Sequence, residues 1–224
     1  MKPLYMARAA YPLLSFAIGR LARKVTRWSV ADDRALRRLY EFLEHNSELK
    51  LRGRLDSSRL KHLRIQVFPD ADLAADIHTA KSTSGMWLRL TDGENHWPLE
   101  WQSKLQTAVS HSTPEAELVS MARALRKFAL PVQGLLQEVL DMTIPIEVYE
   151  DNTATIQIVG AGYSAEMGHL SRTHRISLAW TADVCALPDV HLSHCPTADQ
   201  LGDSFTKALD KHKFQDAQNK LGMG

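Results

Sequence analysis

Four acidic residues occupy positions from which carboxylates could bind a divalent metal ion together. Asp70 follows an apolar run, Glu117 lies near the start of a helical pattern, Asp151 follows a second apolar run, and Asp203 lies near the C-terminus. Residues at the ends of strands and helices tend to converge in proteins whose sheet is covered by helices. Carboxylate oxygens are the ligands that Mg²⁺ and Mn²⁺ prefer. We therefore interpret the four residues as a candidate metal site.

Helical spacing distinguishes Glu117 from its neighbour Glu115. Glu117 lies in line with Met121 and Phe128, whereas Glu115 lies in line with Arg126. A carboxylate on the apolar side of a helix is costly unless a cation pairs with it, which indicates a ligand. The alternative is a first-turn glutamate that complements the helix dipole.

Strand alternation leaves a choice between Glu150 and Asp151. A strand that starts at Ile146 places Val148 and Glu150 on one face and Tyr149 and Asp151 on the other. Only one of the two carboxylates can face a given site, and the spacing does not choose between them. An N-cap role for Asp151 in the helix predicted to follow is the alternative.

The two cysteines do not form a disulfide framework. Cys185 and Cys195 stand in no C-x-x-C pair, which favours a reducing compartment. With His191 and His194 they offer four zinc ligands, but the spacing matches no standard zinc site. We therefore do not expect zinc at these four residues.

The charge is distributed unevenly along the 224 residues. Residues 1–69 hold 15 Lys/Arg and 6 Asp/Glu (+9), and residues 70–224 hold 12 and 20 (−8), within a net charge of +1. The basic third suits phosphate groups and the acidic remainder suits cations, although a solvated pair of basic helices explains the same pattern. No apolar run approaches the roughly 18 residues of a membrane span. We expect a soluble protein without a membrane partner.

The elements that must position the acidic residues follow from periodicity. Apolar residues at helical spacing predict two helices within about residues 10–45, the second capped by Ser29, before a polar, basic linker over 46–61. The later segments predict a mixed α/β sheet, a meander of three strands plus two further strands with helices on its faces. The expected strands are 63–68, 86–90, 100–110, 144–149 and 191–195, and the expected helices are 113–130 (N-cap Thr113, ending before Pro131), 132–140, 152–159, 172–184 and 197–209, with a loop over 160–168.

Four motifs in a fixed order resemble a known family. They are V-F-P-D-A-D-L-A-A-D (67–76) with K-S-T-S-G (81–85), S-H-S-T-P-E-A-E (110–117), V-Y-E-D-N (148–152) and P-T-A-D-Q-L-G-D-S-F-T-K (196–207). Over about residues 63–210 the chain resembles the ribonuclease H domain of copia-type (Pseudoviridae-like) retrotransposon Pol polyproteins. Upstream, F-A-I-G-R-L-A-R (16–23) resembles the end of the family's reverse transcriptase and its connection. The resemblance implies a helical remnant with a basic linker (1–60), a ribonuclease H-like domain (61–212) and a tail (213–224).

The resemblance also implies an activity and its residues. The family's members are endonucleases that hydrolyse the RNA strand of RNA/DNA hybrids with two Mg²⁺ ions, for which Mn²⁺ can substitute. The expected partners are the hybrid and the reverse transcriptase part of the same polyprotein, in the cytoplasm, a virus-like particle or the nucleus. The first 30 residues contain no acidic residue and resemble a mitochondrial transit peptide, which makes the mitochondrion an alternative location. The resemblance assigns catalysis and metal binding to Asp70, Glu117, Asp151 and Asp203, and the expected nucleic-acid contacts are Arg172, His174 and Arg175.

Some positions depart from the family's pattern. Leu73 replaces a common Trp, Gly202 a common Ala, and Ser177 lies in a stretch that commonly reads I-D-x-R. None of these departures removes a ligand. His194 is a candidate by position for the histidine that related enzymes place before the last Asp, and a plain strand residue is the alternative. A catalytically decayed module that binds nucleic acid or supports a polyprotein is the alternative function, and an integrase or resolvase of the same fold is a second.

Overall fold

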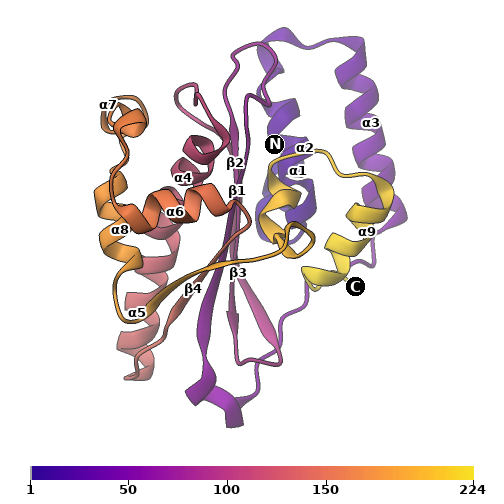
Figure 1. The fold of residues 1–224 in the computed structure, drawn as a ribbon. Coiled ribbons are helices and arrows are strands. Elements are labelled where there is room, and N and C mark those ends of the chain that lie inside the picture. The colour runs from indigo at the N-terminus through magenta and orange to yellow at the C-terminus, as the bar shows by residue number, and fades with distance from the viewer. Residues whose placement is uncertain (1) are drawn as a thin grey trace.

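A five-stranded mixed sheet forms the middle layer of the computed structural model, which describes residues 2–224 (Figure 1). The strand order is β3-β2-β1-β4-β5, in which β1, β2 and β3 form an antiparallel meander and β4 and β5 run parallel to β1. This arrangement confirms the predicted mixed sheet, a meander of three strands plus two further strands. The strands are β1 (Arg64–Asp72), β2 (Thr83–Thr91), β3 (His96–Leu105), β4 (Ile146–Glu150) and β5 (Val190–His194).

Helices from the middle of the chain cover one face of the sheet (Figure 1). The side chains of Ile65, Val67, Leu118 and Ile146 are fully buried between these helices and the strands. Burying an aliphatic side chain of this size stabilises a fold by about 1.5–3 kcal/mol, so this layer fixes the strands and the first helix against one another. The helices are α4 (Thr113–Ala124), α5 (Leu130–Leu140), α6 (Thr153–Ala161), α7 (Leu170–Thr173) and α8 (Leu178–Cys185).

The two ends of the chain cover the other face (Figure 1). Leu13 and Ile18 from the N-terminal segment and Leu221 from the C-terminal segment join Trp87 and Phe205 in a second apolar cluster. The segments on either side of 61–212 thus pack on the same sheet face, whereas the division into three domains stays a prediction. The helices are α1 (Lys2–Ala9), α2 (Ser15–Ala22), α3 (Val30–His45) and α9 (Lys211–Lys220).

The N-terminal segment contains three helices, where the periodicity predicted two. The helix α1 was missed because its eight residues carry only a short apolar stripe, and Pro12 separates it from α2 by a 3-10 turn. The predicted cap of α3 is confirmed, since Ser29 and Asp32 form a capping box.

Pro131 does not end the helix that starts near residue 113. The chain continues through a π-helical turn over Leu125–Ala129, in which the Leu130 N–H bonds to the Leu125 carbonyl. A wider turn accommodates the proline ring, which would clash with the carbonyl four residues earlier in a regular α-helix. The helix start also shifts by one residue, because the Ser112 side chain, not Thr113, accepts the N–H of Glu115.

Three further expectations are corrected. The helix expected over 172–184 is interrupted at Arg175, whose φ of +58° no helix accommodates, and Ser177 caps the new helix α8. The helix expected over 197–209 is instead two 3-10 turns, Thr197–Asp199 and Leu201–Phe205. The third strand spans His96–Leu105, not 100–110, because the turn over 92–95 is held by Asp92 and is shorter than expected.

The remaining differences are small. The loop expected over 160–168 is shorter, because α6 runs to Ala161, where Gly162 ends it with a left-handed conformation. A 3-10 turn over Ala165–Met167 follows. Among residues 2–224, no helix is both long and apolar enough to cross a membrane.

Candidate metal centre

Parallel pairing of two neighbouring strands brings Asp70 and Asp151 to the same level of the sheet. In the register of β1 and β4, Val67 lies opposite Val148. Asp70 and Asp151 each lie three residues further along, so continuation of the register places them side by side. The sequence predicted Asp70 after the first strand, but Asp70 lies within β1. Asp151 directly follows β4.

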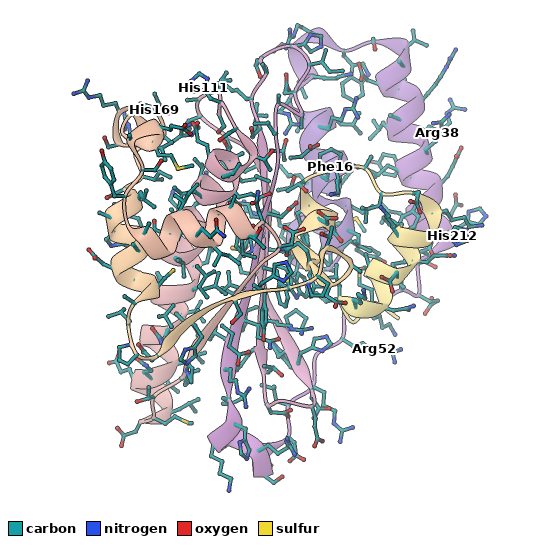
Figure 2. All side chains as sticks on the ribbon, viewed as in Figure 1. Phe16, Arg38, Arg52, His111, His169 and His212 are labelled. Carbon is teal, nitrogen blue, oxygen red and sulfur yellow. The ribbon has the colours of Figure 1, made fainter. Side chains whose placement is uncertain are left out.

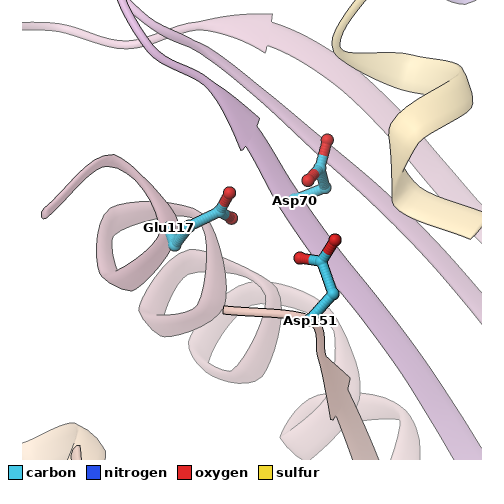
Figure 3. Close-up of side chains that lie close together, drawn as sticks. All are labelled: Asp70, Glu117 and Asp151. Carbon is cyan, nitrogen blue, oxygen red and sulfur yellow. The ribbon is translucent and has the colours of Figure 1, made fainter. Parts of the chain in front are cut away.

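Glu117 completes the cluster from the helix that covers this end of the sheet. It lies in α4, which packs against β1, and its side chain points toward the two aspartates (Figure 3). One ligand atom from each of Asp70, Glu117 and Asp151 lies within 4.8 Å of the others. The structure therefore brings together three of the four predicted site residues.

Burial and mutual repulsion disfavour the charged forms of this cluster. Asp70 and Glu117 are 5% and 3% exposed. Desolvation, with the negative charge of Asp203 as the next cause, raises the pKa of Asp70 to about 7. Desolvation and the nearby Asp70 and Glu150 charges raise the pKa of Glu117 to about 11. One oxygen of Glu117, Oε2, is buried and accepts no hydrogen bond. A cation bound here would offset both the desolvation of these carboxylates and the repulsion between them.

Glu150 is excluded from the group of three, although the sequence could not choose between it and Asp151. Alternation in β4 buries Glu150 completely on the same face as Val148, where its Oε1 accepts the N–H of Asn152. Desolvation raises the pKa of Glu150 to about 8. The cap of α6 is Asn152, not Asp151, because the Asn152 side chain accepts the N–H groups of Ala154 and Thr155. Asp151 is therefore free of the N-cap role.

Asp203 lies near the cluster but is paired with a cation of the chain. Its carboxylate accepts from Lys207 Nζ at 2.7 Å, and it belongs to a 3-10 turn rather than a helix. Its negative charge still contributes to the raised pKa of Asp70. Asp203 is thus a neighbour of the three gathered carboxylates.

Two residues of the last motif hold the centre together and were not identified from the sequence. Gln200 Nε2 donates to the carbonyls of Pro69 and Tyr149, each at 3.0 Å, and so joins β1 and β4 one residue before Asp70 and two residues before Asp151. The Thr206 hydroxyl donates to Asp70 Oδ2. The resemblance of residues 196–207 to a known motif pointed to this segment, but not to these partners.

Glycines allow the last motif to lie against the strands. A Cβ on Gly85, which lies opposite Asp70 in β2, would stand 2.5 Å from the Thr206 side chain and 2.8 Å from the Gly202 carbonyl. A Cβ on Gly202 would stand 2.7 Å from Asp70 Cβ. Position 202, where the family that the motifs resemble commonly has Ala, therefore has no space for a methyl group in this chain.

The other predicted residues do not join the centre. Arg172 and Arg175 are exposed, but His174 is buried, so the expectation that His174 contacts nucleic acid is corrected. His194 is exposed on β5, opposite Glu150. Within residues 2–224 the carboxylate cluster is the only group of three or more metal-ligating side chains whose ligand atoms all lie within 4.8 Å of one another. The ligand atoms of Cys185, His191, His194 and Cys195 are not gathered in this way among the described residues.

The fold and the site define an α/β protein with a mixed five-stranded sheet and a carboxylate cluster across β1, β4 and α4. Its relatives include retrovirus-related Pol polyproteins, which confirms the resemblance found in the motifs. The polyprotein of transposon RE2 from Arabidopsis thaliana is 29% identical over 217 residues, 95% of this chain and 14% of the relative. That of transposon TNT 1-94 from Nicotiana tabacum is 27% identical over 157 residues, 70% of this chain and 11% of the relative.

The chain thus spans only 11–14% of the length of these relatives. Among solved structures, LC11-RNase H1, isolated from compost, aligns with a TM-score of 0.45 and 17% identity, over 64% of this chain and 92% of its own. No family model matches the chain.

Proposed function

We propose that this chain is an endonuclease that hydrolyses the RNA strand of RNA/DNA hybrids as part of retrotransposon reverse transcription. The observation that carries the proposal is the convergence of Asp70, Glu117 and Asp151 at one end of a mixed sheet. The relatives are retrovirus-related Pol polyproteins of transposons, which supports a role within such a polyprotein. The reverse transcriptase part as partner, and the cytoplasm, a particle or the nucleus as location, belong to the same proposal.

The three carboxylates fit divalent metal ions. Oxygen-only donors match Mg²⁺ and Mn²⁺ rather than softer metals. The unpartnered Oε2 of Glu117 and the raised pKa of Asp70 are both consistent with a site that is completed by cations. Asp70, Glu117 and Asp151 would hold two Mg²⁺ ions, with Asp203 as the fourth ligand once its carboxylate leaves Lys207.

Bound ions would supply an activated water and stabilise the departing 3′ oxygen. The residues of the chain supply position and charge. Gln200 fixes the separation of the two aspartates by donating to the carbonyls of Pro69 and Tyr149 on the neighbouring strands. Thr206 fixes the orientation of Asp70 by donating to its carboxylate. Lys207 carries a positive charge beside the cluster, where it can attract a substrate phosphate. Recognition of a hybrid would come from contacts to 2′-hydroxyl groups and from groove shape, so we expect little base preference.

The test is cleavage of an end-labelled RNA/DNA hybrid in Mg²⁺ or Mn²⁺. Duplex DNA and duplex RNA of the same sequence are the substrate controls. We expect cleavage of the hybrid's RNA strand alone, reduced at least about 100-fold by Asp151→Asn, which removes one metal ligand. Asp183→Asn, on the exposed side of α8, is the matched control and should leave the rate unchanged.

Two outcomes would contradict the proposal. Cleavage of duplex DNA would indicate an integrase- or resolvase-like nuclease. Hybrid binding without any cleavage in either metal would indicate a catalytically decayed module that serves the polyprotein through binding alone.

A further inference from the structure

A second group of metal-ligating side chains lies beside the first turn of α4. Glu115, in the first turn of α4, is 2% exposed and has two histidines on its carboxylate. His169 Nε2 lies 3.1 Å and His174 Nε2 3.6 Å from Glu115 Oε1. Both histidines flank α7, more than fifty residues along the chain, so the fold itself assembles this group.

His174 is buried without a hydrogen-bond partner. Its side chain has no exposed surface, and neither ring nitrogen makes a hydrogen bond among the described residues. Its Nε2 faces Glu115 from just beyond hydrogen-bond distance. Buried polar atoms are satisfied in nearly all proteins. The backbone of Val109 lies within reach of the ring, so one ring nitrogen of His174 is left without a partner.

The carboxylate is held in place from its other side. Glu115 Oε2 accepts the backbone N–H of His111 at 3.1 Å. The ring of His111 packs edge to face against that of His169, with 5.4 Å between centroids, and Figure 2 shows both at the same end of the molecule. Glu115 Oε1 is therefore directed toward the two other imidazoles.

We propose that Glu115, His169 and His174 form a second metal site, for a divalent transition-metal ion such as Zn²⁺. Two imidazoles and a carboxylate are a known zinc donor set, which leaves a fourth position for water. Ligand atoms of a tetrahedral zinc ion lie about 3.3 Å apart, which is comparable with the 3.1 and 3.6 Å found here.

Closure of this site requires one imidazole to turn. Among residues 2–224, the only three or more ligand atoms that all lie within 4.8 Å of one another are those of Asp70, Glu117 and Asp151. The two histidines therefore each contact Glu115, but their ring nitrogens are not close enough to share one ion. The side chain of His169 is one-third exposed and can turn if it gives up its hydrogen bond to Glu115, whereas His174 and Glu115 are fixed by burial. An ion bound here would tie α7 to the start of α4, the helix that carries Glu117.

The donor chemistry separates this site from the carboxylate cluster. Imidazole nitrogen selects Zn²⁺ and Co²⁺ over Mg²⁺, whereas the cluster of three carboxylates offers oxygen alone. Co²⁺ therefore serves as a spectroscopic probe, because tetrahedral sites with nitrogen ligands absorb visible light much more strongly than octahedral oxygen sites.

The experiment is a titration of the metal-free full chain with Co²⁺, followed by visible absorption, and then with Zn²⁺, followed by thermal unfolding. We expect one Co²⁺ per chain with the intense tetrahedral bands, displaced by Zn²⁺, and a rise in Tm of about 5–10 °C at 100 times the Zn²⁺ Kd. His169→Ala and Glu115→Gln should abolish the bands. Asp151→Asn should retain them, and so should His191→Ala, an exposed histidine on β5.

The use of His169, which is partly exposed, keeps the test valid if variants of the buried His174 fail to fold. Absence of the tetrahedral bands in the wild-type chain would overturn the proposal. So would bands that persist in His169→Ala or disappear in Asp151→Asn, because the ion would then lie elsewhere. None of these readouts depends on cleavage. The metal-site proposal can therefore be disproved while the proposed nuclease activity is supported, and the activity can be disproved while the metal site is supported.

Discussion

At the scale of single residues, Asp70 and Glu117 are buried carboxylates that lie together and form no ion pair among the described residues. A group whose pKa is higher in the folded than in the unfolded chain binds more protons when folded. Its stabilising contribution is complete below the unfolded pKa and is lost as the pH rises through the folded pKa, which for Asp70 is about 7. The metal-free protein should therefore lose stability between about pH 5.5 and 7.5.

The predicted loss attributable to Asp70 is about 2 kcal/mol over these two pH units. Urea denaturation in EDTA at both pH values measures it, with Asp70→Asn as the comparison. We expect the variant to show a smaller difference between the two pH values, because its side chain does not titrate. An equal difference in both proteins would show that the Asp70 pKa is not raised.

The sequence identified the residues that matter chemically, but not all of their partners. Asp70, Glu117 and Asp151 were predicted from type, spacing and motif, and the structure gathers them. The bridging role of Gln200 could not be predicted, because its two acceptors are backbone carbonyls on strands 131 and 51 residues away. Alternation in β4 left Glu150 and Asp151 equivalent until the position of α4 was known.

At the scale of elements, the turn over residues 201–205 lies directly on β1 and β2, and Gly85 and Gly202 make that approach possible. The sequence suggested a helix here, because it shows a helical pattern up to Leu209. Contact with Asp70 and Phe68 overrides that local preference. The mixed sheet with helices on its faces was predictable from periodicity, whereas the strand order was not predicted and this tertiary override could not be read from the local pattern.

Gly85→Ala should lower the free energy of unfolding by about 1–3 kcal/mol, because the new methyl group overlaps Thr206 and the Gly202 carbonyl. Gly134→Ala in α5 is the matched control. Nothing lies within 4 Å of a Cβ there, so alanine should stabilise the helix by about 0.5–1 kcal/mol. Chemical denaturation measures both. A Gly85→Ala protein as stable as the wild type would show that the turn moves away without cost.

At the scale of the whole molecule, the basic N-terminal third and the C-terminal segment form one layer on the sheet face opposite α4, α6 and α8 (Figure 1). From charge alone, removal of residues 1–60 should weaken hybrid binding and flatten its salt dependence. In the structure the same deletion would uncover Trp87 and Phe68, so weaker binding would report unfolding as well as the missing charge. Charge substitutions on exposed side chains avoid this ambiguity.

Arg172 and Arg175 are the cations to test first, because they flank His174, which packs on Glu115 two residues before Glu117. Neutralising a cation that binds one phosphate should reduce the slope of log K against log salt by about 0.9. Arg172→Gln with Arg175→Gln should therefore flatten the slope for hybrid binding by up to about 1.8.

The matched control is the triple change of Arg34, Arg37 and Arg38 to Gln on the exposed side of α3, across the sheet. It removes more positive charge from the molecule, so a larger effect than that of the Arg172 and Arg175 changes would show that the hybrid binds the N-terminal layer or responds to net charge alone. A larger effect of the Arg172 and Arg175 changes would place the hybrid beside the carboxylate cluster. Fluorescence anisotropy in EDTA across a salt titration separates the two.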